Sequence, residues 1–166
     1  MPELGLDWVD GRNRRGSWRY RRTDGGRSEL GRTSRLKLLL DTHIWFWILT
    51  KPERLSRRVR TNLESGRNEL WLSPISAWEL IVLGERGRMK FDGDARQWVA
   101  KAFERTPVQE AVLNHEIAIR SREIMPGHGD PADRFLVATA LVYDLTLVTA
   151  DATLIGAEAC PVLVNR

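Results

Sequence analysis

Four acidic residues lie where their carboxylates could meet at one site: Asp41, Glu79, Asp133 and Asp151. Asp41 directly follows an apolar run, Leu36–Leu40, and Asp151 comes two residues after another short run, Thr146–Thr149. Sites in open parallel sheets form at the carboxyl ends of strands, so these two acids should share one edge. Converging carboxylates repel one another and need positive charge, and oxygen-only ligation suits Mg²⁺ or Mn²⁺. The four residues therefore indicate a candidate divalent-metal site.

Glu79 is the most informative of the four. At helical spacing its neighbours are Ile75, Val82 and Leu83, so it lies on an apolar stripe that should face the sheet. A lone carboxylate there carries a large desolvation cost unless a partner or a cation compensates its charge.

The other three acids each have a second interpretation. Asp41 and Asp151 could simply cap the helices that follow them. Asp133 stands three residues after Asp130, a spacing that resembles a capping box and also suits the positive end of a helix dipole.

The pattern of elements favours a Rossmann-like fold. Strands are predicted at 36–40, 69–72, 108–113, 146–149 and 162–164, and helices at 42–49, 55–63, 73–83, 94–104, 115–124, 131–143 and 151–155. Strands that alternate with helices form right-handed βαβ units with a parallel sheet covered on both faces. We therefore expect a three-layer α/β/α sandwich with a central, mostly parallel sheet.

Four sequence blocks carry a resemblance to a known family: LLLDTHIWFW, SPISAWEL, GDPADRFLVATA and LTLVTAD. In order and spacing they resemble the VapC-type toxins of the PIN-domain superfamily, over residues 36–166. The resemblance implies a PIN-like fold, an antitoxin partner in a type II toxin–antitoxin pair, and cleavage of RNA. It also implies that the four acids bind Mg²⁺ or Mn²⁺, which would activate the attacking water.

Three further residues could support such a site. Thr42 and Thr149 stand next to or near motif acids and could orient carboxylates or water, although both also suit ordinary capping or strand positions. Arg134 follows Asp133 and could reach a substrate phosphate, or could form a surface ion pair. The histidines have no zinc-like spacing to one another or to Cys160: His43, His115 and His128.

The predicted helix 43–49 (HIWFWIL) is apolar on every side. Such a helix is either fully buried or binds something. Given the resemblance, we expect an antitoxin segment to contact it around Trp45 and Trp47, with complete burial as the alternative. Besides the complex with an antitoxin, the sequence also allows a homodimer of this chain.

Two other classes of function compete with a nuclease. A phosphatase with an aspartate nucleophile at Asp41 would need a second aspartate at position 43, which is a histidine, and a late lysine, but none follows Lys101. A catalytically inactive binding module would need no acids, yet all four are present. No Gly-rich phosphate loop follows the first strand, so nucleotide binding has no support.

Residues 1–35 differ from the rest of the chain. They hold nine arginines and five acids, so they carry the whole net charge of +4, and they show no periodicity. We expect a disordered basic extension at 1–35, with a PIN domain at 36–166 whose true start could be Leu36. No apolar run reaches the roughly 18 residues of a membrane span, which favours a cytoplasmic protein.

Overall fold

A parallel sheet forms the centre of the computed structural model, which describes residues 35–124 and 129–166. Within those residues the sheet has five strands in the order β3-β2-β1-β4-β5, all parallel. The strands are β1 Lys37–Leu40, β2 Glu69–Leu72, β3 Gln109–Glu110, β4 Thr146–Thr149 and β5 Val162–Val164. Their carboxyl ends share one side of the sheet, called the carboxyl edge below.

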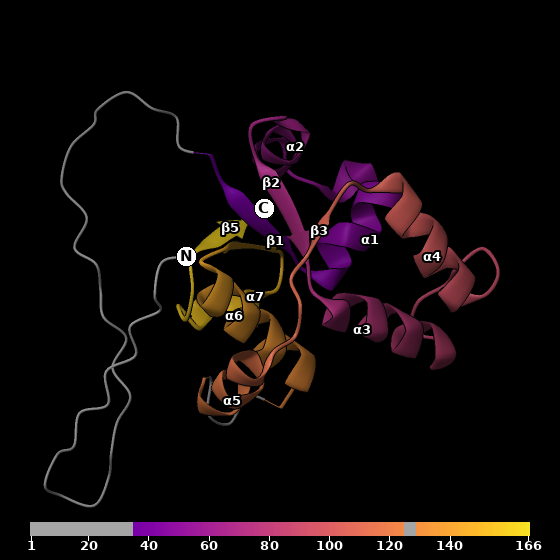
Figure 1. Ribbon diagram of the computed structural model, residues 1–166. Coiled ribbons are helices and arrows are strands. Elements are labelled where there is room, and N and C mark those ends of the chain that lie inside the picture. Colours follow the sequence, from indigo (N-terminus) through magenta and orange to yellow (C-terminus); the bar gives the residue numbers. More distant parts are fainter. Residues whose placement is uncertain (1–34, 125–128) are drawn as a thin grey trace, which may run out of the picture. The chain divides into compact units, whose positions relative to one another are not determined.

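Helices cover both faces of this sheet (Figure 1). They are α1 Thr42–Thr50, η1 Pro52–Arg54 (a 3₁₀ turn), α2 Arg57–Glu64, α3 Pro74–Glu85, α4 Ala95–Arg105, α5 His115–Glu123, α6 Pro131–Tyr143 and α7 Ala152–Gly156. Side chains alternate along β1, so Leu38 and Leu40 pack against α1 to α4, while Leu39 packs against α6 and α7. The three-layer α/β/α prediction is confirmed.

Short polar side chains fix where the helices begin. Every α-helix of the described residues starts after a residue whose side chain accepts a backbone N–H of the first turn: Asp41, Ser56, Ser73, Asp94, Asn114, Asp130 and Asp151. These caps satisfy donors that the helix leaves unpaired, so helix starts were readable from sequence.

Most element boundaries lie within two residues of the predicted ones, and two differences bear on the packing. The strand expected at 108–113 is only Gln109–Glu110, because the chain leaves this sheet edge after Ala111 bonds Leu72. The helix expected to end near Gly84 continues to Glu85.

Gly84 is a point of close approach rather than a helix terminator. A Cβ atom there would lie 2.7 Å from the Cβ of Ala95 and 2.8 Å from Phe91.

The predictions for residues 1–34, Gly127 and His128 lie outside the described residues. Within the described part of the chain, no helix is long and apolar enough to cross a membrane.

Candidate active site

Asp41 lies at the carboxyl edge, where the central strand meets the first helix. Its backbone N–H continues the β1–β4 pairing by bonding Val148 at 3.1 Å. Its side chain is buried, with 6% of the residue exposed, and it accepts the N–H of His43 at 3.3 Å as the N-cap of α1. The other carboxylate oxygen accepts a short hydrogen bond from the Thr149 hydroxyl. Asp41 is therefore a cap, as its simpler interpretation predicts, and also part of a polar network.

Thr149 joins two of the predicted acids. It is fully buried at the end of β4, and its Oγ1 accepts the backbone N–H of Asp151 at 3.0 Å while donating to Asp41. Asp151 is exposed, and one of its oxygens caps α7 through Thr153 at 2.6 Å and Leu154 at 3.2 Å. One buried hydroxyl thus fixes Asp41 relative to the start of α7.

Glu79 reaches the same edge from α3. Its Oε2 accepts the hydroxyl of Thr42 at 2.7 Å, and Thr42 is fully buried in the first turn of α1. Glu79 itself is half-buried. Thr42, which immediately follows Asp41 in sequence, is therefore a hydrogen-bond partner of Glu79, although its neutral hydroxyl does not offset the carboxylate charge.

Two acids lie at the N-terminal end of α6. Asp130 caps this helix by accepting the N–H of Ala132 at 2.9 Å, and Asp133 is half-buried in its first turn. Helix α6 packs beside α3, and the charge of Asp130 is one of the smaller causes that raise the pKa of Glu79. Sequence reasoning treated Asp130 only as a cap. The signal that could have identified it was its spacing of one helical turn from Asp133.

The electrostatics show which acids the fold brings together. Burial raises the pKa of Asp41, against the Thr149 hydrogen bond and the His43 charge, while Asp151 adds a smaller upward effect. Burial also raises the pKa of Glu79, against its bond from Thr42, and the charges of Asp41 and Asp130 raise it further. Ionised carboxylates are therefore disfavoured here without a compensating cation.

The acids suit a metal that keeps part of its water. Among the described residues, no three His, Cys, Asp or Glu side chains are close enough to hold one ion together. Their donors are nevertheless all oxygens, and two of the acids are desolvated. This set fits Mg²⁺, which retains waters and takes few direct carboxylates, better than a soft metal that needs a closed cage.

Arg134 was predicted to reach a substrate phosphate or to form a surface ion pair. Arg134 is half-buried in α6 and makes no hydrogen bond or ion pair with a described residue.

Trp45 was expected to contact a partner, and that expectation is wrong. It is fully buried against Trp98 and Phe103, and its indole N–H lies 3.4 Å from Thr106.

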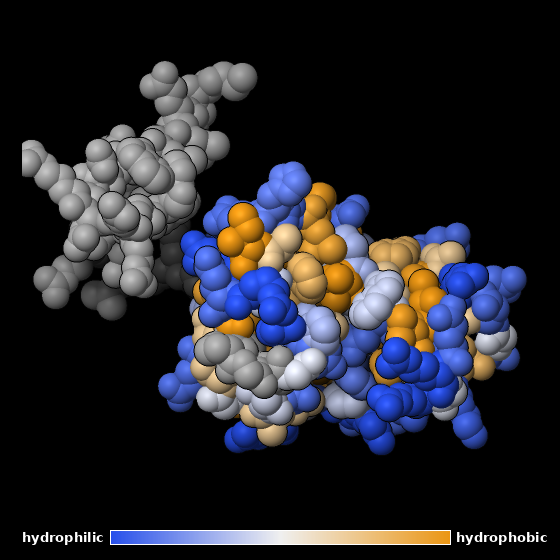
Figure 2. Space-filling view, turned by 90° about the horizontal axis from the view of Figure 1, so that it is seen from below, coloured by the Kyte–Doolittle hydropathy of each residue, from blue (hydrophilic) through white to orange (hydrophobic). Residues whose placement is uncertain are grey.

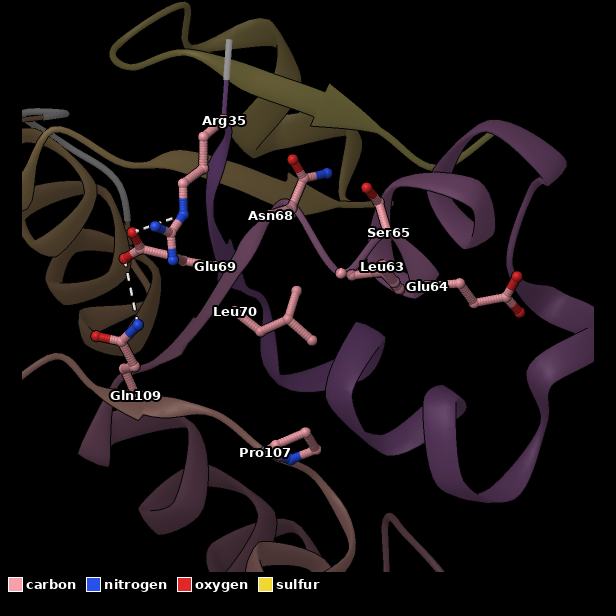
Figure 3. A pocket seen from close by; sticks show the side chains of 10 residues that line it. Arg35, Leu63, Glu64, Ser65, Asn68, Glu69, Leu70, Pro107 and Gln109 are labelled. Atoms are coloured by element: carbon pink, nitrogen blue, oxygen red, sulfur yellow. Dashed lines mark hydrogen bonds and ion pairs between the residues drawn. The ribbon is translucent and has the colours of Figure 1, made fainter. Parts of the chain in front are cut away.

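A hollow of about 330 Å³ lies at the opposite side of the sheet, at the amino ends of β1 and β2 (Figure 3). Leu63, Leu70 and Pro107 line it, and Arg35 pairs with Glu69 at 3.1 Å on its rim. The acids are at the carboxyl edge instead, so this hollow is separate from the candidate active site.

The fold and the acids at its carboxyl edge define a Rossmann-like α/β/α domain with an acidic site. The family model described as PIN domain matches residues 38–157, and the chain therefore belongs to the PIN-domain family. The resemblance predicted from the four sequence blocks is confirmed.

One curated relative and several solved structures of similar fold carry VapC or VapBC names. The chain is 31% identical over 115 residues to Ribonuclease VapC22 of Mycobacterium tuberculosis, which covers 69% of this chain and 86% of that protein. Its fold resembles VapBC2 from Rickettsia felis, with a TM-score of 0.60 and 14% identity over 79% of this chain and 100% of that one. It also resembles VapBC-1 from nontypeable Haemophilus influenzae, with a TM-score of 0.55 and 18% identity over 78% of this chain and 98% of that one.

Proposed function

We propose that this chain is a divalent-metal-dependent endoribonuclease and the toxin of a type II toxin–antitoxin pair. The observation that carries the proposal is the polar network of Asp41, Thr149, Asp151, Thr42 and Glu79 at the carboxyl edge of a PIN domain. The 31% identity to a protein named a ribonuclease supports the same reaction.

In this proposal Asp41, Glu79, Asp133 and Asp151 hold Mg²⁺ or Mn²⁺. When bound, the metal supplies an activated water and offsets charge on the scissile phosphate. Thr149 fixes one oxygen of Asp41 by donating to it, and Thr42 does the same for Glu79. These hydrogen bonds hold both carboxylates in place, which is the usual effect of a hydrogen bond to a ligating group.

Arg134 contributes charge in the proposal. It lies one residue beyond Asp133 and has no protein partner among the described residues, so its guanidinium is available to a substrate phosphate.

The proposed protein partner is a cognate antitoxin, because several structural neighbours are VapBC complexes and one is titled a toxin–antitoxin complex from Klebsiella pneumoniae. With RNA as substrate, the place of action is the cytoplasm. A homodimer is a separate prediction, which light scattering of the purified chain tests.

The decisive experiment incubates purified full chain with total RNA in Mg²⁺, in Mn²⁺ and in EDTA, and then maps the product ends. We expect discrete cuts with either metal and none in EDTA. Cutting at full rate in EDTA would contradict the site assignment. RNA left intact with both metals would favour an inactive binding module.

A further inference from the structure

A run of exposed basic residues follows α1. Between positions 51 and 60 the chain has five of them and one acid, Glu53. They are Lys51, Arg54, Arg57, Arg58 and Arg60, called the basic face below. None of the five forms an ion pair with any described residue. The predicted domain, residues 36–166, is neutral in total, so this face is a local concentration of unpaired positive charge.

The basic face is attached to the catalytic end of the sheet. Asn165, buried just after β5, accepts the N–H of Ser56 at 2.7 Å and donates to the carbonyl of Arg54 at 3.0 Å. The backbone N–H of Asn165 in turn bonds the carbonyl of Thr149 at 2.9 Å. Because Thr149 also binds Asp41, a short chain of hydrogen bonds connects the acids to the backbone of the basic face.

Aromatic side chains on α1 lie between the acids and the basic face. His43 is exposed, and its backbone N–H donates to the Asp41 carboxylate at 3.3 Å. Its ring centroid is 6.1 Å from that of Trp47, one helical turn along α1. The guanidinium carbon of Arg54 lies over the Trp47 ring at 5.4 Å, which holds this arginine against α1.

We infer that the basic face, together with His43 and Trp47, binds the single-stranded RNA that enters the acidic site. This inference rests on the proposed function. A groove that binds single strands combines positive charge along the backbone with aromatic rings for the bases. The acids alone repel a phosphate chain, so cations beside them are needed to guide it.

The chemistry of this face favours RNA over a protein segment. The large apolar side chains that are most exposed lie on other parts of the described chain: Trp78, Phe103, Val112, Leu113, Ile119 and Leu141. Figure 2 views the molecule from below, from the side where α3 and α5 lie in Figure 1, and shows apolar patches on that face. Beside the basic face, Trp45 is buried and Trp47 is half-buried with Arg54 over one side of its ring, so the exposed groups there are mainly cationic.

The test measures RNA affinity by fluorescence anisotropy with a short labelled single-stranded oligoribonucleotide of mixed sequence. The full chain carries Asp41→Asn throughout, so that the probe is not cut. One variant combines Arg54→Gln, Arg57→Gln and Arg58→Gln. Its matched control combines Lys37→Gln, Arg86→Gln and Arg88→Gln, three exposed bases at the start of β1 and after α3 that change the net charge equally.

We expect the basic-face variant to lose about tenfold or more in affinity at low salt and to reduce the salt slope by about 2, since each phosphate contact contributes about 0.7. The control should change the slope little. Trp47→Leu should weaken binding about fivefold, and less when Arg54→Gln is already present, because the ring acts partly through that arginine.

Equal losses in the two triple variants would overturn the inference, because binding would then follow net charge alone. Unchanged RNA affinity in the basic-face variant would also overturn it. If the same variant instead lost affinity for the co-expressed antitoxin, this face would be a protein interface. None of these results affects the cleavage assay of the unmutated chain, so failure of the inference and of the proposed function can be told apart.

Discussion

At the scale of single residues, the site depends on carboxylates that the fold buries. The pKa of Asp41 is raised above its ordinary value of 3.8, chiefly by burial. The folded protein therefore keeps the Asp41 proton to higher pH than the unfolded chain does. The stability that this residue contributes is full below the ordinary pKa and is lost as pH rises through the raised folded pKa.

Asp41→Asn should abolish RNA cleavage without unfolding the protein. Because asparagine cannot ionise, the variant in EDTA should be about as stable as the unmutated chain in acid and equally or more stable at neutral pH. Urea denaturation over a pH series measures this difference. Asp144→Asn, an exposed change at the end of α6, is the control. A variant that is clearly less stable at neutral pH and still cuts RNA would show that Asp41 is structural.

Thr149→Val should lower the cleavage rate about 10- to 100-fold, the usual cost of losing a hydrogen bond to a ligating group. Thr149→Ser should recover most of the rate, because it keeps the hydroxyl that donates to Asp41. The matched control is Thr139→Val, a buried threonine whose hydroxyl bonds the carbonyl of Phe135 within its own helix. If the valine variant cut RNA at the normal rate, the hydrogen bond to Asp41 would have no role in the reaction.

At the scale of elements, Gly84 of helix α3 packs against the first residue of α4, Ala95, and against Phe91 in the segment before it. The predicted effect of Gly84→Ala is a loss of about 1–3 kcal/mol of stability, because the added methyl group would overlap Ala95 and Phe91. Gly156→Ala is the comparison, since a Cβ there meets open space within α7. Denaturant midpoints of the two variants measure the effect. Equal midpoints would mean that the α3–α4 contact adjusts freely.

Most elements were predictable because their signals are local. Apolar runs and side-chain caps gave β1, β2, β4, β5 and the starts of the helices within a residue or two. The short β3 was not predictable in length, because its end depends on where the chain leaves a sheet edge. The role of Gly84 was also hidden, since it depends on a neighbour eleven positions away, Ala95.

The acids of the site were predictable in type but not in their contacts. Asp41 and Asp151 follow strands, and Glu79 interrupts an apolar stripe, so the sequence marks all three. The hydrogen bond of Thr42 with Glu79 and the shared hydroxyl of Thr149 arise from packing between elements far apart in sequence. Trp45 was misplaced for the same reason, because a helix that is apolar all round does not reveal which side faces the core.

At the scale of the whole molecule, we propose that residues 1–35 are dispensable. A chain that starts at Leu36 should keep its stability, its cleavage rate and its salt slope for RNA. It loses the ion pair of Arg35 with Glu69, but Arg35 is largely exposed and such pairs contribute about 0–1 kcal/mol. The comparison uses both chains in the anisotropy and cleavage assays. A large fall in RNA affinity at low salt for the short chain would assign the extension an RNA-binding role.

The strand order has a consequence for when the proposed active site can form during synthesis of the chain. In the strand order β3-β2-β1-β4-β5, β1 pairs with β2 on one side and with β4 on the other. Asp41 directly follows β1, so its surroundings are complete only after β4 has been synthesised. Until then Asp41 lacks Thr149, and Asp151 has not yet been translated. In the proposed function, a nascent chain that ends after β3 lacks Asp133, Thr149 and Asp151, so we expect it to leave the RNA of its own ribosome uncut until β4 and Asp151 have emerged.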